Sequence, residues 1–378
     1  MQTPEAPIPP SDLGRYRILS PTCGLRVSPL QFGAMSLGEA WGGPARFVNK
    51  KQSFKLLDTF FEAGGNFIDT ANDYQNEQSE KFVGEWIAER KNRDQIVLAT
   101  KYSLDYKSYE LGKGKAVNHM GNHKRSMYMS VRDSLKKLQT EWIDILYVHI
   151  WEYTTSIEEV MNGLHELVMQ GKILYLGISD TPAWIVSAAN KYAVAHGKTP
   201  FCIYQGRWNA MTRDLERDII PMCMHFGMAI APYDVLNHGK FQSAKVIEER
   251  LSGGEGFRRG DDFSEREIKM NEVLAKVADE HGAVSVPGIA IAYVMAKAPY
   301  VFPILGSRKI ENIEDNIKSL SIKLTPEQVA FIDGAVPFDF GFPINSFGLD
   351  PSFTGHPGAF LTRSIAMSVV KGPQAIGY

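Results

Sequence analysis

The sequence of 378 residues predicts a (β/α)8 TIM barrel with an N-terminal hairpin, long loops and a C-terminal tail over the barrel mouth. Short apolar runs that end in a polar residue alternate with longer stretches of helical period. Eight such runs occur, which is the number of strands that this barrel contains. The chain also exceeds the roughly 250 residues of a plain eightfold barrel, so one domain with long loops is expected.

The apolar runs are interpreted as parallel strands because helical segments separate them. In order they are LQFGAMS (30–36), NFIDT (66–70), IVLATK (96–101), DILYVHI (144–150), ILYLGIS (173–179), FCIYQG (201–206), MAIAPYD (228–234) and VFPILGS (301–307). Several of the helical stretches end in glycine, which is typical of a helix C-terminus. An open, doubly wound sheet is the competing fold, but no strand is followed by its G-x-G-x-x-G motif.

The domain boundaries follow from this pattern. Residues 1–14 are predicted to be a flexible N-terminus, residues 15–337 to form the barrel, and residues 338–378 to form a tail that belongs to the same domain. The segment 15–30 predicts two short strands about a turn at Cys23 and Gly24. The glycine-rich stretch 252–260 lacks the G-K-[ST] of a phosphate-binding P-loop and is interpreted as a flexible loop.

The composition argues against several partners. Forty-one basic and 43 acidic residues give a net charge of -2, which offers no broad field for nucleic acid or an anionic membrane. The first residues do not resemble a signal peptide, and no apolar stretch is long enough to span a bilayer. Three cysteines without C-x-x-C spacing favour a reducing, cytoplasmic location and no thiolate metal site. A small-molecule substrate is expected, and the oligomeric state is not predicted.

Four side chains at the predicted strand ends carry the expected chemistry. Asp69 closes one strand, Lys101 closes the next, and His149 lies at the end of a third, while Tyr74 follows Asp69 by five residues. Reactive groups of a TIM barrel lie where strands end, so successive strands would place these four around one rim. Taken singly, an aspartate there is often a helix cap and a lysine is often solvated.

Together the four residues suit the reduction of a carbonyl group. The alkoxide-like oxygen that hydride addition leaves needs a proton, and tyrosine donates one efficiently only if its pKa falls. A buried lysine favours the phenolate, and Asp69 would keep Lys101 charged in the interior. His149 would donate a hydrogen bond to the substrate oxygen and orient it.

These blocks resemble the aldo-keto reductase superfamily, whose tetrad of Asp, Tyr, Lys and His has this order and approximate spacing. FIDTANDY with the SE at 79–80, ATK at 99–101 and DILYVH at 144–149 are similar to its catalytic blocks. The resemblance spans about residues 15–337. Within the superfamily, segments such as YLGISDTPAWIVSAANKYA are similar to fungal aryl-alcohol dehydrogenases and to norsolorinic acid reductase-like enzymes of polyketide clusters.

The resemblance also implies a cofactor, NADP. It implies that Ser179, Asp180 and Gln205 hold the carboxamide and that the nicotinamide stacks on Tyr233. A late phosphate block, ILGSRKIENIEDN, implies contacts from Gly306, Ser307, Arg308, Asn312, Asp315 and Asn316. Backbone N–H groups at a helix start suit an anion, and Arg308 with Lys309 can neutralise a 2'-phosphate, so NADP is favoured over NAD.

Substrate specificity is expected to depend on the stretch 102–122, the loop 237–263 and the tail, which could all overhang the mouth. Four aromatic residues would suit a flat aromatic substrate, although residues of this kind more often serve in plain packing. They are Trp41, Tyr106, Trp151 and Phe347.

Three other functions stay open. His119 and His123 have the i, i+4 spacing of a metal site, although Gly121 lies between them. Asp69 and Glu152 could be the paired acids of a barrel glycosidase, which would leave Tyr74 and Lys101 without a role. Some aldo-keto reductase relatives are NADPH-binding subunits of ion channels, so a regulatory protein with little turnover is the main alternative to an enzyme.

Overall fold

A computed structural model describes residues 6–42, 48–254, 256–257, 259–282, 284–372 and 374–375. The predicted flexible loop 252–260 includes residues 255 and 258, and the predicted flexible N-terminus includes residues 1–5. These residues lie outside the described ones.

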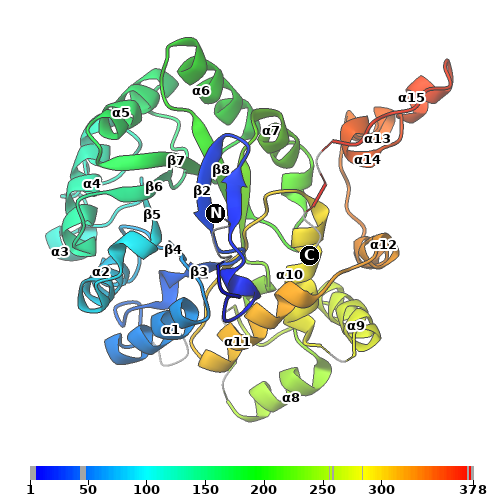
Figure 1. The fold of residues 1–378 in the computed structure, drawn as a ribbon, viewed down its shortest axis with the longest axis horizontal. Coiled ribbons are helices and arrows are strands. Elements are labelled where there is room, and N and C mark those ends of the chain that lie inside the picture. The colour runs from blue at the N-terminus through cyan, green and yellow to red at the C-terminus, as the bar shows by residue number, and fades with distance from the viewer. Residues whose placement is uncertain are drawn as a thin grey trace, which may run out of the picture.

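Eight parallel strands form a barrel inside a ring of helices (Figure 1). They are β3 (Gln31–Gly33), β4 (Phe67–Asp69), β5 (Val97–Tyr102), β6 (Ile143–Val148), β7 (Ile173–Ser179), β8 (Phe201–Arg207), β9 (Ala229–Tyr233) and β10 (Ile304–Leu305). The hydrogen-bonded order is β10-β3-β4-β5-β6-β7-β8-β9. The amide of Ile230 in β9 donates to the carbonyl of Tyr300, and the amide of Phe302 donates back to Ile230. These bonds close the barrel, so the predicted fold is confirmed.

Fifteen α-helices occur among the described residues, and several of them begin at a residue whose side chain caps the first turn. They are α1 (Lys50–Glu62), α2 (Gln78–Arg90), α3 (Ser108–Leu111), α4 (Lys124–Leu138), α5 (Ile157–Met169), α6 (Ala183–Ala195), α7 (Ile219–Phe226), α8 (Ala244–Ser252), α9 (Glu265–Glu280), α10 (Val286–Lys297), α11 (Ile310–Lys318), α12 (Pro326–Ala335), α13 (Ile344–Phe347), α14 (Pro351–Thr354) and α15 (Ala359–Thr362). Ser156, Ser264 and Thr325 each accept a hydrogen bond from the first turn of the helix that follows. Each cap satisfies an amide that the helix itself leaves unpaired.

The hairpin is present, but its predicted turn was wrong by two residues. Strands β1 (Arg17–Ser20) and β2 (Cys23–Val27) pair antiparallel, with Cys23 opposite Ser20. The turn therefore falls on Pro21 and Thr22. Proline is preorganised for the first central position of a turn, and this preference outweighs the glycine at 24.

The hairpin lies across the centre of the barrel in Figure 1. Its buried side chains Leu19, Cys23 and Val27 pack in one cluster with Phe67 and Val97, the first residues of β4 and β5. The hairpin therefore covers the amino-terminal ends of the strands. The opposite rim, where the strands end, is not covered by the hairpin, and this is the face on which TIM barrels carry their reactive groups.

The C-terminal tail does not take its predicted place over the mouth. Figure 1 shows α13, α14 and α15 outside the ring of helices. The guanidinium of Arg213 lies 5.1 Å from the ring centre of Phe338, and Arg217 donates to the carbonyl of Asp339. These cation–π and hydrogen-bond contacts hold the start of the tail at the edge of the barrel, from which it runs outward.

Among the described residues, no helix has both the length and the apolar character that crossing a bilayer requires. The three cysteines are buried free thiols.

Candidate active site

The rim of the barrel brings the four predicted side chains together. Asp69 is the last residue of β4, Lys101 lies near the end of β5, and His149 directly follows β6. Tyr74 lies in the loop between β4 and α2. Because neighbouring strands of a parallel sheet end on the same side, residues far apart in sequence meet here.

Lys101 lies at the centre of this group. Its ammonium lies 2.7 Å from Asp69 Oδ2, 2.7 Å from the carbonyl of Thr70 and 3.3 Å from the hydroxyl of Tyr74. The side chain is 0% exposed and that of Asp69 4%. A charge this deep in the protein is tolerated because a carboxylate and a carbonyl accept its hydrogen bonds. The structure therefore holds a buried cation against the phenol.

His149 lies beside Tyr74, with the two ring centres 5.8 Å apart and the ring planes at 74°. Burial and the nearby charge of Lys101 hold the pKa of His149 well below its usual value, so the imidazole is neutral. A neutral imidazole carries one proton and offers one donor and one acceptor nitrogen. Its Nδ1 faces Asp73 at 3.6 Å. Sequence reasoning assigned no role to Asp73, because a carboxylate beside the tyrosine could equally have pointed to solvent.

The loop that carries Tyr74 has an unusual backbone. Gln75, Asn76 and Glu77 all have positive φ, of 53°, 50° and 72°. Side chains rarely adopt this left-handed conformation, so the surroundings must hold the loop in place.

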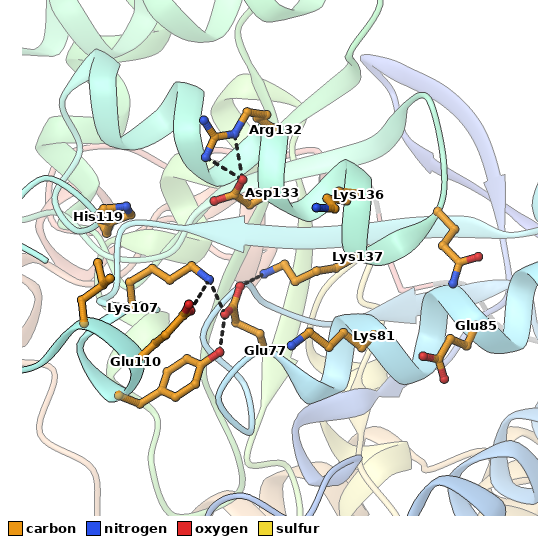
Figure 2. A pocket seen from close by; sticks show the side chains of 13 residues that line it. Glu77, Lys81, Glu85, Lys107, Glu110, His119, Arg132, Asp133, Lys136 and Lys137 are labelled. Atoms are coloured by element: carbon orange, nitrogen blue, oxygen red, sulfur yellow. Dashed lines mark hydrogen bonds and ion pairs between the residues drawn. The ribbon is translucent and has the colours of Figure 1, made fainter.

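Glu77 supplies that support. Its buried carboxylate accepts hydrogen bonds from Lys107 Nζ at 2.8 Å and from the hydroxyl of Tyr109, and it lies 3.0 Å from Lys137 Nζ. Figure 2 shows Lys107 and Lys137 reaching Glu77 from opposite sides. The stretch 102–122, for which the sequence allows a place over the mouth, contacts the tyrosine loop through Lys107 and Tyr109.

Lys137 extends the network beneath the loop. Its ammonium lies 2.6 Å from Glu80 Oε2 and donates to the carbonyl of Asn72 at 3.3 Å. Helices α2 and α4 approach closely at Gly84, where a Cβ would overlap the carbonyl of Lys137. The absence of a side chain at Gly84 therefore allows Lys137 to reach both carboxylates.

A surface hollow opens beside this network, between α2, α3 and α4 (Figure 2). Its lining contains none of the four rim residues, and its deepest charges, Glu77 and Lys137, neutralise each other. The hollow belongs to the support of the loop and is not the candidate active site.

The residues expected around a nicotinamide lie at or near the carboxyl ends of three neighbouring strands, β7, β8 and β9. Ser179 ends β7 and Tyr233 ends β9, while Asp180 has a φ of 41° and accepts from the hydroxyl of Tyr233 at 3.1 Å. Gln205 in β8 donates to Asp69 Oδ1 at 2.9 Å, so its amide nitrogen also orients the buried carboxylate. Ser179 is buried at the end of β7, and its Oγ lies close enough to the Asp180 carboxylate to help lower the pKa of that group against the effect of burial.

The residues expected around a phosphate follow β10. Gly306 and Ser307 lie between this strand and α11, and the exposed backbone of Gly306 leaves room for an anion. Arg308 is half-buried beside the start of α11, with its carbonyl held by Gln52 Nε2 at 2.7 Å. Three residues of the predicted set lie within α11: Asn312 is exposed, Asp315 is half-buried and Asn316 is buried. Asn316 therefore has the least access to a ligand of the three.

Two of the alternative sites have ordinary structural explanations. Glu152 accepts hydrogen bonds from the amide and hydroxyl of Thr154 and from the hydroxyl of Thr155. These bonds hold the pKa of Glu152 at about 2 despite partial burial, which does not suit the proton donor of a glycosidase. His123 caps α4, its Nδ1 accepting from the amide of Ser126.

The fold and the rim define a class of protein: a parallel (β/α)8 barrel whose strand ends bring a buried ammonium, a phenol and an imidazole close together. The chain matches the aldo/keto reductase family over residues 29–337. It belongs to that family and is an oxidoreductase.

Similar proteins come from fungi. The chain is 62% identical over 351 residues to a putative aryl-alcohol dehydrogenase of Saccharomyces cerevisiae, covering 92% of this chain and 93% of the relative. It is 57% identical over 352 residues to an aryl-alcohol dehydrogenase (NADP+) of Phanerodontia chrysosporium, covering 91% of each. It is 50% identical over 345 residues to norsolorinic acid reductase A of Aspergillus parasiticus, covering 91% and 87%.

Proposed function

We propose that this protein is an NADPH-dependent reductase that interconverts an aldehyde or ketone and its alcohol, with Tyr74 as the general acid and base. The observation that carries the proposal is the 3.3 Å contact between the buried ammonium of Lys101 and the hydroxyl of Tyr74. An ammonium at this distance stabilises the phenolate, so the phenol becomes a better proton donor.

Each rim residue has a distinct part. NADPH, when bound, supplies the hydride to the carbonyl carbon. Tyr74 gives its proton to the developing alkoxide and takes it back in the oxidation of an alcohol. Lys101 stabilises the phenolate that remains, and Asp69 keeps Lys101 charged and oriented. His149, being neutral, can hold the substrate oxygen by a hydrogen bond without adding a charge.

The same rim has residues that would hold the cofactor. Ser179, Asp180 and Gln205 would bind the carboxamide, and the ring of Tyr233 would stack on the nicotinamide. The late block would hold the phosphates through Gly306, Ser307, Arg308, Asn312, Asp315 and Asn316. We favour NADPH over NADH because Arg308 and Lys309 can pair with a 2'-phosphate, and a similar protein is named for NADP+.

An aromatic carbonyl is the favoured substrate class. Trp41 is 42% exposed, and its ring lies 6.1 Å from that of Tyr74 at an interplanar angle of 76°. It therefore offers a flat apolar surface beside the proton donor. Tyr106 and Trp151 are buried and act in packing, and Phe347 lies in the tail beside Phe342 and Phe360. The names of the similar aryl-alcohol dehydrogenases point to the same class.

The test compares Tyr74→Phe with the native protein in NADPH oxidation by an aromatic aldehyde such as veratraldehyde. Removing the proton donor should lower kcat by at least about a hundredfold and leave NADPH affinity, measured by fluorescence titration, nearly unchanged. Tyr128→Phe on the exposed face of α4 is the control and should behave as the native protein.

Unchanged turnover in Tyr74→Phe would contradict the role of this residue. Tight NADPH binding by the native protein with no turnover on any aldehyde or ketone would favour the regulatory alternative instead.

A further inference from the structure

Asp73 brings a second carboxylate to the rim, on the side of His149 that the mechanism leaves unused. Its Oδ1 lies 3.6 Å from His149 Nδ1, and the two side chains are only 14% and 11% exposed. Neither atom has a hydrogen-bond partner in the part of the chain that the structure describes. Buried polar atoms are nearly always satisfied, so two unsatisfied atoms that face each other require an explanation.

A proton between the two atoms would satisfy both. The distance is slightly too long for a hydrogen bond as it stands. Hydrogen bonds in catalytic sites are often long in the ligand-free protein and shorten when the substrate binds. Nδ1 is thereby directed at the carboxyl group, and Nε2, the other nitrogen of the ring, is left for the substrate.

We propose that Asp73 is a positioning residue that decides which ring nitrogen of His149 carries a proton, and thereby whether His149 donates to a carbonyl oxygen or accepts from an alcohol hydroxyl. The inference rests on the proposed reductase function and specifies which tautomer of His149 takes part in it.

Counting protons gives the two states. When the Asp73–His149 pair holds two protons, one lies between Oδ1 and Nδ1 and the other is on Nε2, which donates. When the pair loses one proton, Asp73 is a carboxylate and the remaining proton is most stable on Nδ1, facing that charge. Nε2 then has a lone pair and accepts. The two groups titrate as one unit because they share the proton.

Burial, together with the surrounding charges, sets the pH at which this change occurs. Burial raises the pKa of Asp73 to about 6, although the ammonium of Lys101 opposes the rise. Burial and Lys101 also keep the pKa of His149 low, so the imidazole does not hold a second proton alone. The titratable groups that face the pair are Lys101 from β5, Glu80 from α2, Lys137 from α4 and Tyr74 from the loop.

The state of His149 can be read without cofactor or substrate. Nitrogen-15 NMR of histidine-labelled protein distinguishes a protonated from an unprotonated ring nitrogen, and the signals of His149 among the nine histidines are those lost in His149→Gln. We expect the Nε2–H form at about pH 5 and the Nδ1–H form at about pH 8, on either side of the pair's titration. In Asp73→Asn the amide group can donate to Nδ1 at every pH, so His149 should stay in the Nε2–H form. Asp94→Asn, which removes an exposed carboxylate, should keep the native change.

Kinetics supply the second measurement. The kcat/KM for carbonyl reduction should fall by about tenfold between about pH 5 and about pH 8 in the native protein, and this fall should be absent in Asp73→Asn. A purely structural role for Asp73 would lower activity equally at every pH and would not move the tautomer.

The same tautomer of native His149 at both pH values, or an unaltered change in Asp73→Asn, would overturn the inference. Because the NMR measurement uses no substrate, it can succeed or fail independently of the reductase function, which the Tyr74→Phe experiment decides.

Discussion

The ammonium of Lys101 lies 3.3 Å from the hydroxyl of Tyr74, although the whole of α2 separates the two residues in the sequence. The same ammonium is paired with Asp69 at 2.7 Å and is shielded from solvent. Loss of Lys101 should therefore affect two properties at once: the acidity of the phenol and the stability of a buried carboxylate.

Lys101→Met should lower kcat for carbonyl reduction by at least about a hundredfold, because the phenolate loses its stabilising charge. It should also lower the free energy of unfolding by about 3–5 kcal/mol, because the Asp69 carboxylate is left buried without its cation. Steady-state kinetics and urea unfolding measure the two effects.

The double variant Asp69→Asn, Lys101→Met separates them. It removes both charges, so most of the lost stability should return while activity stays low. If activity returned together with stability, the charge of Lys101 would have no direct part in the reaction.

The buried network beneath the tyrosine loop leads to the next prediction. Lys137→Met removes the cation between Glu77 and Glu80, and two buried carboxylates should then repel each other. We expect a loss of about 3–5 kcal/mol in the free energy of unfolding, and a lower kcat because the loop is no longer held.

Lys136→Met is the matched control, since Lys136 is the adjacent residue of α4 and is exposed. It should change stability by less than about 0.5 kcal/mol. Equal effects of the two variants would show that Lys137 does not support the loop.

The barrel could be predicted from the sequence because its signal is repeated. Each apolar run recurs as a strand, and β7 has the bounds that its run predicts, 173–179. The bounds of other strands differ from those of their runs. The run 301–307 contains only the two-residue strand β10, because Pro303 has no amide to donate to a neighbouring strand. Strand-end residues such as Asp69 and Lys101 could be assigned because barrel geometry fixes where strands end.

Contacts between distant surface segments could not be predicted in this way. Nothing in the local pattern indicates that Lys107 and Lys137 meet at Glu77, because burial of charged residues depends on how α2, α3 and α4 pack. The direction of the tail could not be predicted either, because no local pattern indicates that Arg213 stacks on Phe338. The position of the Asp73 carboxylate beside His149 likewise depends on packing that no local pattern indicates.

Cofactor preference is tested at the start of α11. Arg308→Ala should raise the dissociation constant for NADPH by about 10–100-fold, since a charge-assisted hydrogen bond to phosphate contributes about 1.5–3 kcal/mol. NADH, which has no 2'-phosphate, should be affected much less. Fluorescence titration gives both constants, and Lys318→Ala at the other end of α11 is the control. Equal weakening of the two cofactors would reject the contact between Arg308 and the 2'-phosphate.

The buried carboxylate of Asp73 should make the protein less stable as pH rises. Its pKa is about 6 in the folded protein, against a usual value of 3.8, because burial disfavours the charged form. Below about pH 4 the group is protonated in both the folded and unfolded states, so it imposes no cost. Between about pH 4 and about pH 6 the unfolded state loses the proton while the folded state keeps it, so about 2–3 kcal/mol of stability is lost, and the loss is complete above about pH 6. Asp73→Asn should therefore match the native protein in urea unfolding near pH 4 and exceed it by about this amount near pH 8. A difference that did not grow with pH would mean that Asp73 is well solvated, and the Asp73–His149 pair would then lose the burial on which its titration depends.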